Sequence, residues 1–298
     1  MLSVFIDGSQ GTTGLRIRER LSERTDIRLL TLPESERKSL TARAALAQQA
    51  DATFLCLPDD AARELVDALE GKKAVIFDTS TAHRTDPRFA YGFAELGPEF
   101  AEAIVHKDRI AVPGCHASGA IALLHPLVKA GLLDKNHPVA LTSLTGYSGG
   151  GKKMIAEYES ENRDKGLSSP RPYALTQQHK HLPEIMAVCG LQATPIFQPM
   201  VADYYSGMLV SLPLWPRLMK GAPTMADVTA VYQAAYEGKP LLRVLPPNAG
   251  ESLLAANALS GRDDMQVFVT GSDERMIAVC RFDNLGKGAS GAAIECLN

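Results

Sequence analysis

Hydrophobic positions in the first part of the chain alternate between short apolar runs and longer amphipathic segments. The runs are typical of buried strands, and the segments between them have the spacing of helices with one apolar face. In the first helix we expect Leu15 and Leu21 on that face. Such alternation is typical of βαβ units with a parallel sheet and right-handed crossovers. We predict strands at residues 2–7, 27–32, 52–57, 74–78 and 109–112, and helices at 13–22, 42–50 and 59–69.

The pattern changes in the middle of the chain, where strands are separated by loops and few helices are evident. Strands are predicted at residues 139–145, 195–198, 208–214, 242–244 and 266–271. This pattern is typical of a mixed or antiparallel α+β domain. A small-residue helix at 289–296 is expected to pack back onto the first domain. The predicted fold class is α/β: a Rossmann-type parallel-sheet dinucleotide-binding domain plus a mixed α+β catalytic domain.

Bulk composition excludes several classes of partner. The 298 residues are 45% hydrophobic and 22% charged, as in ordinary globular proteins. A formal charge of -3 without a basic block gives no reason to expect nucleic acid or an anionic membrane. We expect neither a signal peptide nor a membrane span. The five scattered cysteines form no CxxC pair, which argues against a disulfide framework or zinc site and for the reducing cytoplasm.

Glycines cluster between the first predicted strand and the first predicted helix. Gly8, Gly11 and Gly14 form a G-x-x-G-x-x-G pattern that includes Thr12 and Thr13. Glycines permit a tight turn and let backbone N–H groups approach a pyrophosphate at the helix N-terminus. The spacing departs from the commoner G-x-G-x-x-G, and a glycine turn without a ligand is the alternative. Its place in a βαβ unit favours a dinucleotide site.

A charged segment lies about twenty residues after the last glycine, where the ribose of a dinucleotide is recognised. Arg37 and Lys38 suit the 2′-phosphate of NADP, whereas Glu34 would suit the 2′-hydroxyl of NAD. A solvated charged loop is a further alternative. The sequence favours NADP, bound as NADPH.

Cys115 follows Pro113 and Gly114 at the end of a predicted strand and begins a predicted helix. Unpaired N–H groups and the helix dipole at that position lower a thiol pKa and enrich the nucleophilic thiolate. The same N–H groups can serve as an oxyanion hole. An inert buried cysteine is the alternative. We interpret Cys115 as a covalent nucleophile.

Four segments carry a family resemblance. They are the N-terminal glycines, the Pro113-Gly114-Cys115 turn, Tyr173 with residues 179–184, and residues 283–291. Together they resemble the N-acetyl-γ-glutamyl-phosphate reductase family in its shorter form, and more distantly aspartate-semialdehyde dehydrogenase. The resemblance implies an NADP-dependent acyl-phosphate reductase of arginine biosynthesis that is a homodimer or homotetramer. It also implies a discontinuous NADP-binding domain at 1–114 and 280–298, and a catalytic and oligomerisation domain at 115–279.

The resemblance implies a general acid/base role for either His179 or His181, with Glu184 orienting that histidine or contacting substrate. An imidazole suits this role because its pKa lies near working pH. On a strand the two histidines would share a face. A metal site lacks a convincing third ligand nearby, and a surface histidine pair is the alternative. The choice between His179 and His181 stays open.

Residues 146–153 read G-x-x-x-x-G-K, but Lys153 stands where a P-loop needs Ser or Thr. The resemblance instead implies a loop that presents Ser148, Gly149 and Lys152 to the acyl phosphate, as backbone N–H nests bind anions. A flexible glycine loop is the alternative. The resemblance also assigns Tyr173 to the substrate and Asn284 to the cofactor.

The nucleophile segment departs from the family pattern in three positions. Val112 stands where the family has Asn, which puts a hydrogen bond near the thiol in doubt. Ser118 keeps a hydroxyl at the helix start. His116 is either a second titratable group or an exposed loop histidine.

The implied reaction forms a thioester on Cys115, which hydride from NADPH converts to N-acetylglutamate semialdehyde. Three alternatives stay open: aspartate-semialdehyde dehydrogenase, a non-catalytic NADP-sensing protein, and a cysteine hydrolase.

Overall fold

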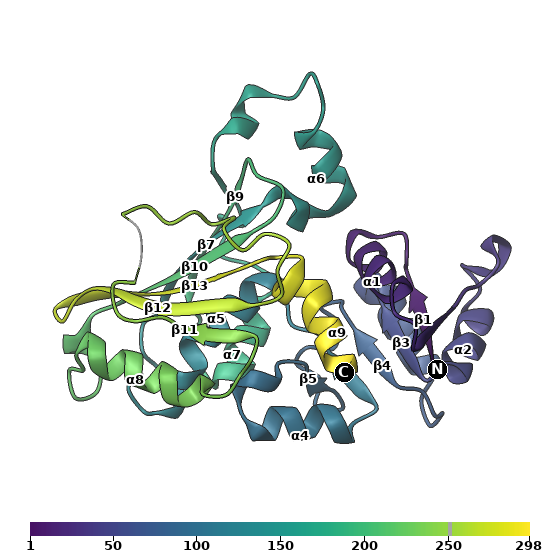
Figure 1. The fold of residues 1–298 in the computed structure, drawn as a ribbon, viewed down its shortest axis with the longest axis horizontal. Coiled ribbons are helices and arrows are strands. Elements are labelled where there is room, and N and C mark those ends of the chain that lie inside the picture. Colours follow the sequence, from purple (N-terminus) through teal and green to yellow (C-terminus); the bar gives the residue numbers. More distant parts are fainter. Residues whose placement is uncertain (250–251) are drawn as a thin grey trace. The chain divides into compact units, whose positions relative to one another are not determined.

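The computed structural model describes residues 1–249 and 252–298, which fall into two compact units (Figure 1). Unit 1 comprises residues 1–94, 98–113 and 289–298, and unit 2 comprises residues 95–97 and 114–288. Residues 280–288, which we expected in the first domain, therefore lie in unit 2. The chain re-enters unit 1 only at Ala289.

Unit 1 contains a parallel sheet in the strand order β2-β1-β3-β4-β6-β5. The chain runs from β1 outward to β2 and then returns to the other side of β1 as β3. The carboxyl ends of β1 and β3 therefore form a topological switch point, where doubly wound sheets bind ligands. The strands are β1 (Leu2–Asp7), β2 (Ile27–Leu30), β3 (Ala52–Leu55), β4 (Ile76–Asp78), β5 (Ala90–Tyr91) and β6 (Arg109–Ala111).

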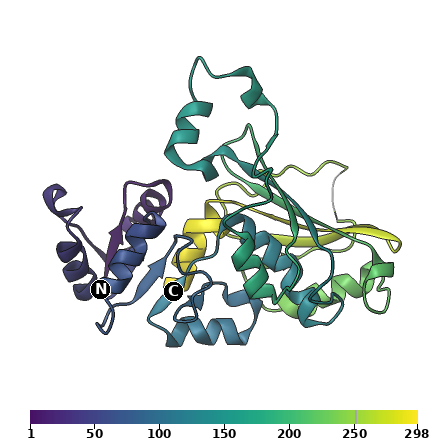
Figure 2. The same ribbon diagram turned by 180° about the vertical axis from the view of Figure 1, so that it is seen from behind.

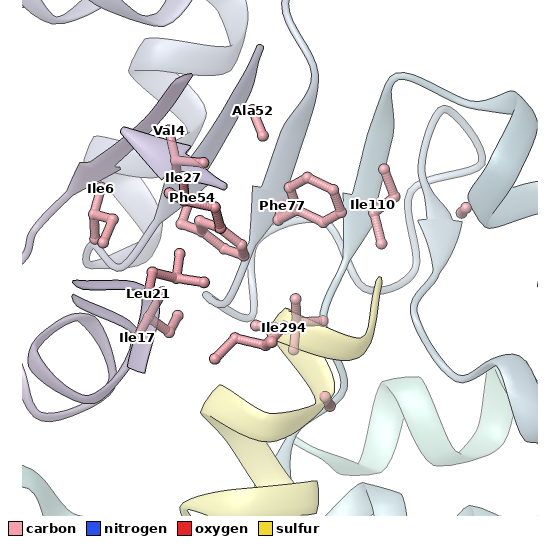
Figure 3. Packing of buried hydrophobic residues seen from close by; sticks show 14 residues of the cluster. Val4, Ile6, Ile17, Leu21, Ile27, Ala52, Phe54, Phe77, Ile110 and Ile294 are labelled. Atoms are coloured by element: carbon pink, nitrogen blue, oxygen red, sulfur yellow. The ribbon is translucent and has the colours of Figure 1, made fainter. Parts of the chain in front are cut away.

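Helices pack on both faces of this sheet because its strands are apolar on both sides. Val4, Phe54 and Phe77 point toward α1 (Thr12–Ser22) and α9 (Gly291–Leu297), which contributes Ile294 (Figure 3). The alternate strand residues, including Phe5, pack with α2 and α3. The remaining helices of this unit are α2 (Leu40–Gln49), α3 (Asp59–Ala68) and α4 (Pro98–His106).

The prediction for Leu15 is wrong. Leu15 is 40% exposed, whereas Ile17 and Leu21 are fully buried. The buried stripe of α1 runs through Gly14, Ile17 and Leu21 at helical spacing, which leaves Leu15 on the outer side.

Unit 2 is built on a mixed sheet in the order β11-β12-β13-β10-β7-β9-β8. Helices α5 (Cys115–Lys129), α7 (Leu182–Cys189) and α8 (Met225–Tyr236) pack on one face (Figure 2). Helix α6 (Gly151–Tyr158) lies in a segment beyond the sheet edge. The strands are β7 (Ala140–Gly146), β8 (Arg171–Pro172), β9 (Ile196–Ala202), β10 (Met208–Leu214), β11 (Leu242–Val244), β12 (Met265–Ser272) and β13 (Arg275–Phe282).

Helix α5 carries a proline in its interior, and α8 compensates for it. Pro126 has no N–H to donate to the carbonyl of Ala122. The Tyr236 hydroxyl donates to that carbonyl at 2.7 Å, and the Tyr232 hydroxyl donates to the Leu123 carbonyl at 2.8 Å. These buried bonds fix α5, and with it the helix start at Cys115.

The α/β fold class is confirmed, with element ends that differ by a few residues. The second unit holds more helices than expected, because α6, α7 and α8 went unpredicted. Strand β13 was missed as well.

Candidate active site

The turn after β1 requires glycine at two of its three glycine positions. Gly8 has a φ of +85°, and a Cβ there would lie 2.2 Å from the carbonyl oxygen of Cys56. A Cβ at Gly14 would lie 2.5 Å from the Gly8 oxygen, whereas one at Gly11 would meet that oxygen at an ordinary 3.5 Å. Gly11 is the N-cap of α1, so the N–H groups that follow it are open to an anion.

A cavity of about 490 Å³ adjoins this turn beside the carboxyl ends of β1 and β2. Asp7 also lines it, but its carboxylate is paired with Arg43, whose Nε lies 2.6 Å from Asp7 Oδ2. Glu34 does not line the cavity. The cavity therefore suits a ligand with negative charge. Its basic lining residues are Arg18, Arg37, Lys38 and Arg43.

The structure thus brings the predicted Arg37 and Lys38 to the same cavity as Gly8. Arg18 on α1 and Arg43 on α2 line the cavity as well, and neither was predicted. A possible signal was the position of Arg18 one helical turn after Gly14, since residues four apart share a helix face.

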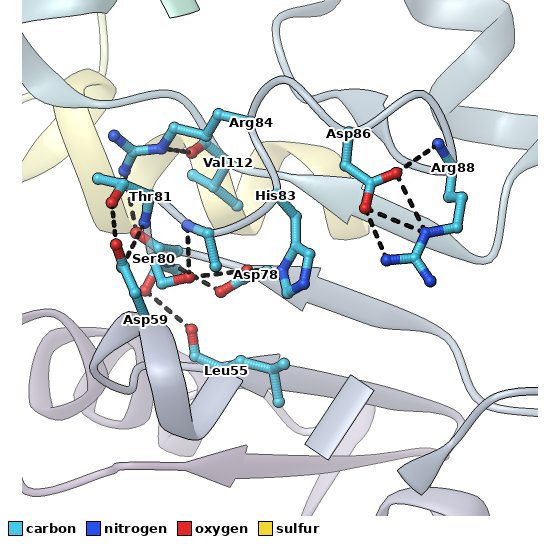
Figure 4. A network of polar contacts seen from close by, with 12 residues as sticks. Leu55, Asp59, Asp78, Ser80, Thr81, His83, Arg84, Asp86, Arg88 and Val112 are labelled. Atoms are coloured by element: carbon cyan, nitrogen blue, oxygen red, sulfur yellow. Dashed lines mark hydrogen bonds and ion pairs between the residues drawn. The ribbon is translucent and has the colours of Figure 1, made fainter. Parts of the chain in front are cut away.

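A polar network fixes the loop after β4 (Figure 4). The buried Asp78 accepts hydrogen bonds from the backbone N–H and the hydroxyl of Ser80 at 2.9 and 2.8 Å, and lies 2.6 Å from His83 Nδ1. Arg84 Nε donates to the Val112 carbonyl at 3.0 Å, and the Val112 N–H donates to the Asp78 carbonyl. Val112 is therefore held through its backbone, while its side chain is buried in the core of unit 1.

Cys115 is half-buried and is the first residue of α5, directly after the N-cap Gly114. The helix start offers it unpaired N–H groups and the positive end of the dipole. In unit 2 a Cβ at Gly288 would lie 3.0 Å from the Cβ of Cys115. Gly288, the last residue of the segment 283–288, therefore packs against the candidate nucleophile.

Other cysteines are poorly suited to nucleophilic chemistry. Burial raises the pKa of Cys56 to about 12 and raises those of Cys189 and Cys280 further. Cys296 is half-buried in the core of unit 1. Burial thus favours the thiol form of Cys56, Cys189 and Cys280, and Cys115 stays the candidate nucleophile.

Glu184 is buried in the first turn of α7 and reaches the start of α5. Its Oε1 accepts a hydrogen bond from the Gly114 N–H at 2.8 Å. This bond fixes the turn immediately before Cys115. The geometry supports a positioning role for Glu184 at the turn before Cys115.

His179 and His181 do not lie on a strand, so the expected alternation is wrong. They lie in the turn before α7, where His181 is the N-cap. The backbone N–H of His181 donates to His179 Nδ1 at 3.2 Å, and the two ring centroids are 4.8 Å apart. Burial, with the positive charge of Lys180, lowers the pKa of His179 to about 4. His179 is therefore neutral at neutral pH and able to accept a proton.

His116 is buried beside these rings, so an exposed loop histidine is excluded. Its ring centroid lies 5.5 Å from that of His179 and 5.7 Å from that of His181. Its Nδ1 is 2.6 Å from Ser143 Oγ, and its Nε2 is 2.7 Å from Tyr173 Oη. Burial, with the charges of His179 and Lys180, lowers the pKa of His116 to about 3. No sequence pattern indicated Ser143, which β7 brings to this ring.

The glycine loop, residues 146–153, begins with a turn whose backbone N–H groups are hydrogen-bonded. The N–H groups of Gly146, Tyr147 and Ser148 donate to carbonyls of residues 204–207. Ser148 is buried, and its hydroxyl accepts from Asn284 Nδ2 at 3.1 Å. The start of the loop is therefore held by backbone hydrogen bonds, and the N–H groups of Gly146, Tyr147 and Ser148 are not available to an anion. Lys152 is exposed on the first turn of α6.

Asn284 lies in unit 2 and bridges two loops there. Its Oδ1 accepts from the Gly207 N–H at 2.8 Å while its Nδ2 donates to Ser148. One hydrogen and one lone pair of the amide stay available for a cofactor.

Among residues 1–249 and 252–298, no group of three or more His, Cys, Asp or Glu side chains is arranged to hold a metal ion. Within the same residues, no helix is long and apolar enough to cross a membrane.

The glycine turn at a switch point, and the cysteine at a helix start directly before the buried His116, define the class as a dinucleotide-binding protein with a cysteine at its candidate active site. Residues 3–104 match the model of the semialdehyde dehydrogenase NAD binding domain. Residues 115–284 match that of the semialdehyde dehydrogenase dimerisation domain. The chain is 44% identical over 301 residues to the N-acetyl-gamma-glutamyl-phosphate reductases of Brucella ovis and Brucella canis, covering 99% of this chain and 97% of each relative.

The chain therefore belongs to the semialdehyde dehydrogenase family and, within it, to the N-acetyl-gamma-glutamyl-phosphate reductases. Solved structures share the fold. The aspartate semialdehyde dehydrogenase of Francisella tularensis matches with a TM-score of 0.75 at 16% identity, over 100% of this chain and 99% of its own. That of Candida albicans, solved with NADP, matches with a TM-score of 0.67 at 18% identity, over 100% and 97%.

Proposed function

We propose that this protein reduces N-acetyl-γ-glutamyl phosphate with NADPH to N-acetylglutamate semialdehyde and phosphate, a step of arginine biosynthesis. The observation that carries the proposal is Cys115 at the start of α5, directly before the buried His116, whose ring packs against that of His179, in a chain 44% identical to reductases of that name. A half-buried thiol at a helix start is suited to attack an acyl carbonyl.

In this mechanism the Cys115 thiolate attacks the γ-carbonyl carbon, the bond to the phosphate oxygen breaks, and a thioester forms. N–H groups at the start of α5 stabilise the oxygen that becomes negative. NADPH, when bound, supplies the hydride that reduces the thioester carbon. The resulting thiohemiacetal collapses to the aldehyde and restores the Cys115 thiolate.

His179 or His181 acts as the general acid/base in these reaction steps. His179, held neutral at neutral pH, can accept the hydroxyl proton of the thiohemiacetal and return it. Glu184 keeps the turn before Cys115 in place through the Gly114 N–H. Ser148, Gly149, Lys152 and Tyr173 are proposed for the acyl phosphate, of which Lys152 provides positive charge for the departing phosphate.

The residues of unit 1 fit an NADP cofactor. The glycine turn has no room for side chains at Gly8 and Gly14, as close approach to a pyrophosphate requires. Arg37 and Lys38, with Arg18, suit the 2′-phosphate in the basic cavity. Thr12, Thr13 and Gly11 are proposed for the pyrophosphate, and Asn284 for the nicotinamide. We assign unit 1 to the cofactor and unit 2 to catalysis.

The protein is further proposed to be a homodimer or homotetramer in the cytoplasm. The face of the unit 2 sheet opposite α5 carries Ile196 and Ile277, which are 64% and 40% exposed. The model that matches this unit is described as a dimerisation domain. None of the five cysteines, all of which lie in the described residues, forms a disulfide, and this fits a reducing compartment.

The test is phosphate-dependent reduction of NADP⁺ by N-acetylglutamate semialdehyde, with wild type and Cys115→Ala side by side. Aspartate semialdehyde serves as the competing substrate. Turnover of the acetylated aldehyde alone, abolished by Cys115→Ala, supports the proposal. Preference for aspartate semialdehyde would make the protein an aspartate-semialdehyde dehydrogenase. NADPH binding without turnover of either aldehyde would favour a sensor.

A further inference from the structure

A buried ion pair in unit 2 is not used by the reaction described above. Lys287 Nζ lies 2.5 Å from Glu95 Oε1, and each side chain is only 3% exposed. Both residues belong to unit 2, which the chain first enters for residues 95–97. The pair thus joins two segments of that unit that are 192 positions apart in the sequence.

Stability alone does not account for this pair. Removing two charges from water costs about as much as their attraction returns, so a buried ion pair adds little net stability. Glu95 Oε2 is also buried and has no hydrogen-bond partner within the described residues, which adds to the cost. The best-attested role of buried polar and ionic groups is to select one register among several. The position of Lys287 shows which register is at stake.

Lys287 lies in a π-helical turn, Gly286–Ser290. The Gly288 N–H donates to the Asp283 carbonyl, five residues back, at 3.0 Å. Such turns are rare and often lie at functional sites. A return to α-helical bonding would move the residues of the turn by one position, which is about 100° around the helix axis. The turn therefore needs a contact that holds its register.

The register decides which residue faces Cys115. A Cβ at Gly288 would lie 3.0 Å from the Cβ of Cys115, which is tighter than ordinary contact. The neighbours of Gly288 in the sequence, Lys287 and Ala289, both carry a Cβ. A shift of one position would therefore press a side chain against the candidate nucleophile, where Gly288 leaves room.

We propose that the Lys287–Glu95 ion pair fixes the register of the π-helical turn and thereby keeps Gly288, and no side chain, against Cys115. Lys287 and Glu95 are positioning residues, since they act through Gly288. The inference rests on the function proposed above, because it assigns how the space beside the nucleophile of that reaction is kept open for the acyl group.

Substitutions in and around the pair separate register from stability. Lys287→Met removes the charge at nearly constant side-chain length and frees the turn to shift. Lys287→Arg keeps the charge and can donate to both carboxylate oxygens of Glu95, so it should retain the register. Gly288→Ala places a Cβ against Cys115 directly and is the positive control. Thr224→Ala removes the N-cap of α8 in the same unit and is the control for lost stability alone.

The experiment compares alkylation of Cys115 by iodoacetamide and by the bulkier N-ethylmaleimide, read by mass spectrometry of its peptide without substrate. Thermal melting reports the stability of each variant. We expect Lys287→Met and Gly288→Ala to lower the N-ethylmaleimide rate relative to the iodoacetamide rate by about threefold or more. Both should lower kcat for N-acetylglutamate semialdehyde about ten- to hundredfold, because small displacements at a reacting centre are costly.

The remaining variants should separate from these two. We expect Lys287→Arg to stay near wild type in the alkylation ratio and in kcat. Thr224→Ala should melt at a lower temperature and leave both quantities unchanged. In a Gly288→Ala background, Lys287→Met should have no further effect, since a side chain already lies against Cys115.

A wild-type alkylation ratio in Lys287→Met would overturn the register role. An equal loss of the ratio in Thr224→Ala would do the same, as would independent losses from Lys287→Met and Gly288→Ala. Glu95→Gln keeps an acceptor for Lys287 without the negative charge and should show a smaller loss of the same kind, so the test stands even where Lys287→Met fails to fold. Alkylation needs no acyl phosphate, so failure of the register role is distinguishable from failure of the proposed reaction, which only the turnover assay reports.

Discussion

The glycine turn after β1 offers a matched pair of substitutions that separate folding from cofactor binding. In Gly8→Ala the new Cβ would lie 2.2 Å from the Cys56 carbonyl oxygen and 2.8 Å from its carbon, and the backbone has a φ of +85°. A left-handed conformation costs a non-glycine residue about 1–2 kcal/mol, and relief of the clash requires movement of the backbone after β3. We expect Gly8→Ala to lower the free energy of unfolding by at least about 2 kcal/mol.

Gly11→Ala is the control. Its Cβ would meet the Gly8 oxygen at 3.5 Å, and its φ is an ordinary -73°. We expect urea unfolding of this variant to match wild type within about 0.5 kcal/mol. NADPH binding, measured by quenching of protein fluorescence, should weaken in both variants, because Gly11 caps the helix that faces the pyrophosphate. If Gly8→Ala and Gly11→Ala unfold at the same urea concentration, the steric reasoning for the turn is wrong.

Three further predictions follow from the site. Glu184→Ala removes the charge-assisted bond to the Gly114 N–H and should lower the free energy of unfolding by about 1.5–3 kcal/mol. The stability of Glu184→Gln should lie between those of wild type and Glu184→Ala. Equal urea midpoints for the three proteins would contradict this. His116 and His179, with pKa values lowered to about 3 and about 4, are neutral in the folded protein, so below pH 6.5 the unfolded chain binds protons that the folded one does not. Stability should therefore fall as the pH decreases from 6.5 toward 4, by up to about 1.4 kcal/mol per pH unit for His116, and His116→Gln should flatten the fall in urea titrations. Removing the charges of Arg37 and Lys38 together should raise the KM for NADPH about tenfold or more with little change for NADH, and parallel changes for both cofactors would refute a 2′-phosphate site.

The sequence was sufficient for the parts of the fold that are set by local patterns. Buried parallel strands are continuous apolar runs, and the glycine turn needs φ values and close approaches that only glycine tolerates, so residues 2–14 could be interpreted from sequence alone. The position of Cys115 at a helix start followed from Pro113 and Gly114 in the same way.

The features of the site that were not predicted depend on tertiary contacts between segments far apart in the sequence. Ser143 reaches His116 across 27 positions, and Glu184 reaches Gly114 across 70. No local pattern encodes such distances. His179 and His181 were expected on a strand because alternation is the simplest way for residues two apart to share a face, whereas a turn capped by His181 brings the rings together.

Asn284 and Ser148 show a further limit of prediction from sequence. Both were assigned from a resemblance to cofactor and substrate, respectively, and the fold also joins them to each other across 136 positions. Their bond ties the glycine loop to the segment after β13. A residue can thus shape a site and serve as part of it, and sequence alone does not separate the two roles.

The most direct test of the central claim is to trap the covalent intermediate. The protein is incubated with N-acetylglutamate semialdehyde and NADP⁺ without phosphate, quenched in acid, and its cysteine peptides are analysed by mass spectrometry. The account predicts an N-acetylglutamyl thioester on the Cys115 peptide alone, removed by added phosphate and absent in Cys115→Ala. An adduct on another cysteine, or reduction of NADP⁺ by the Cys115→Ala protein, would contradict it.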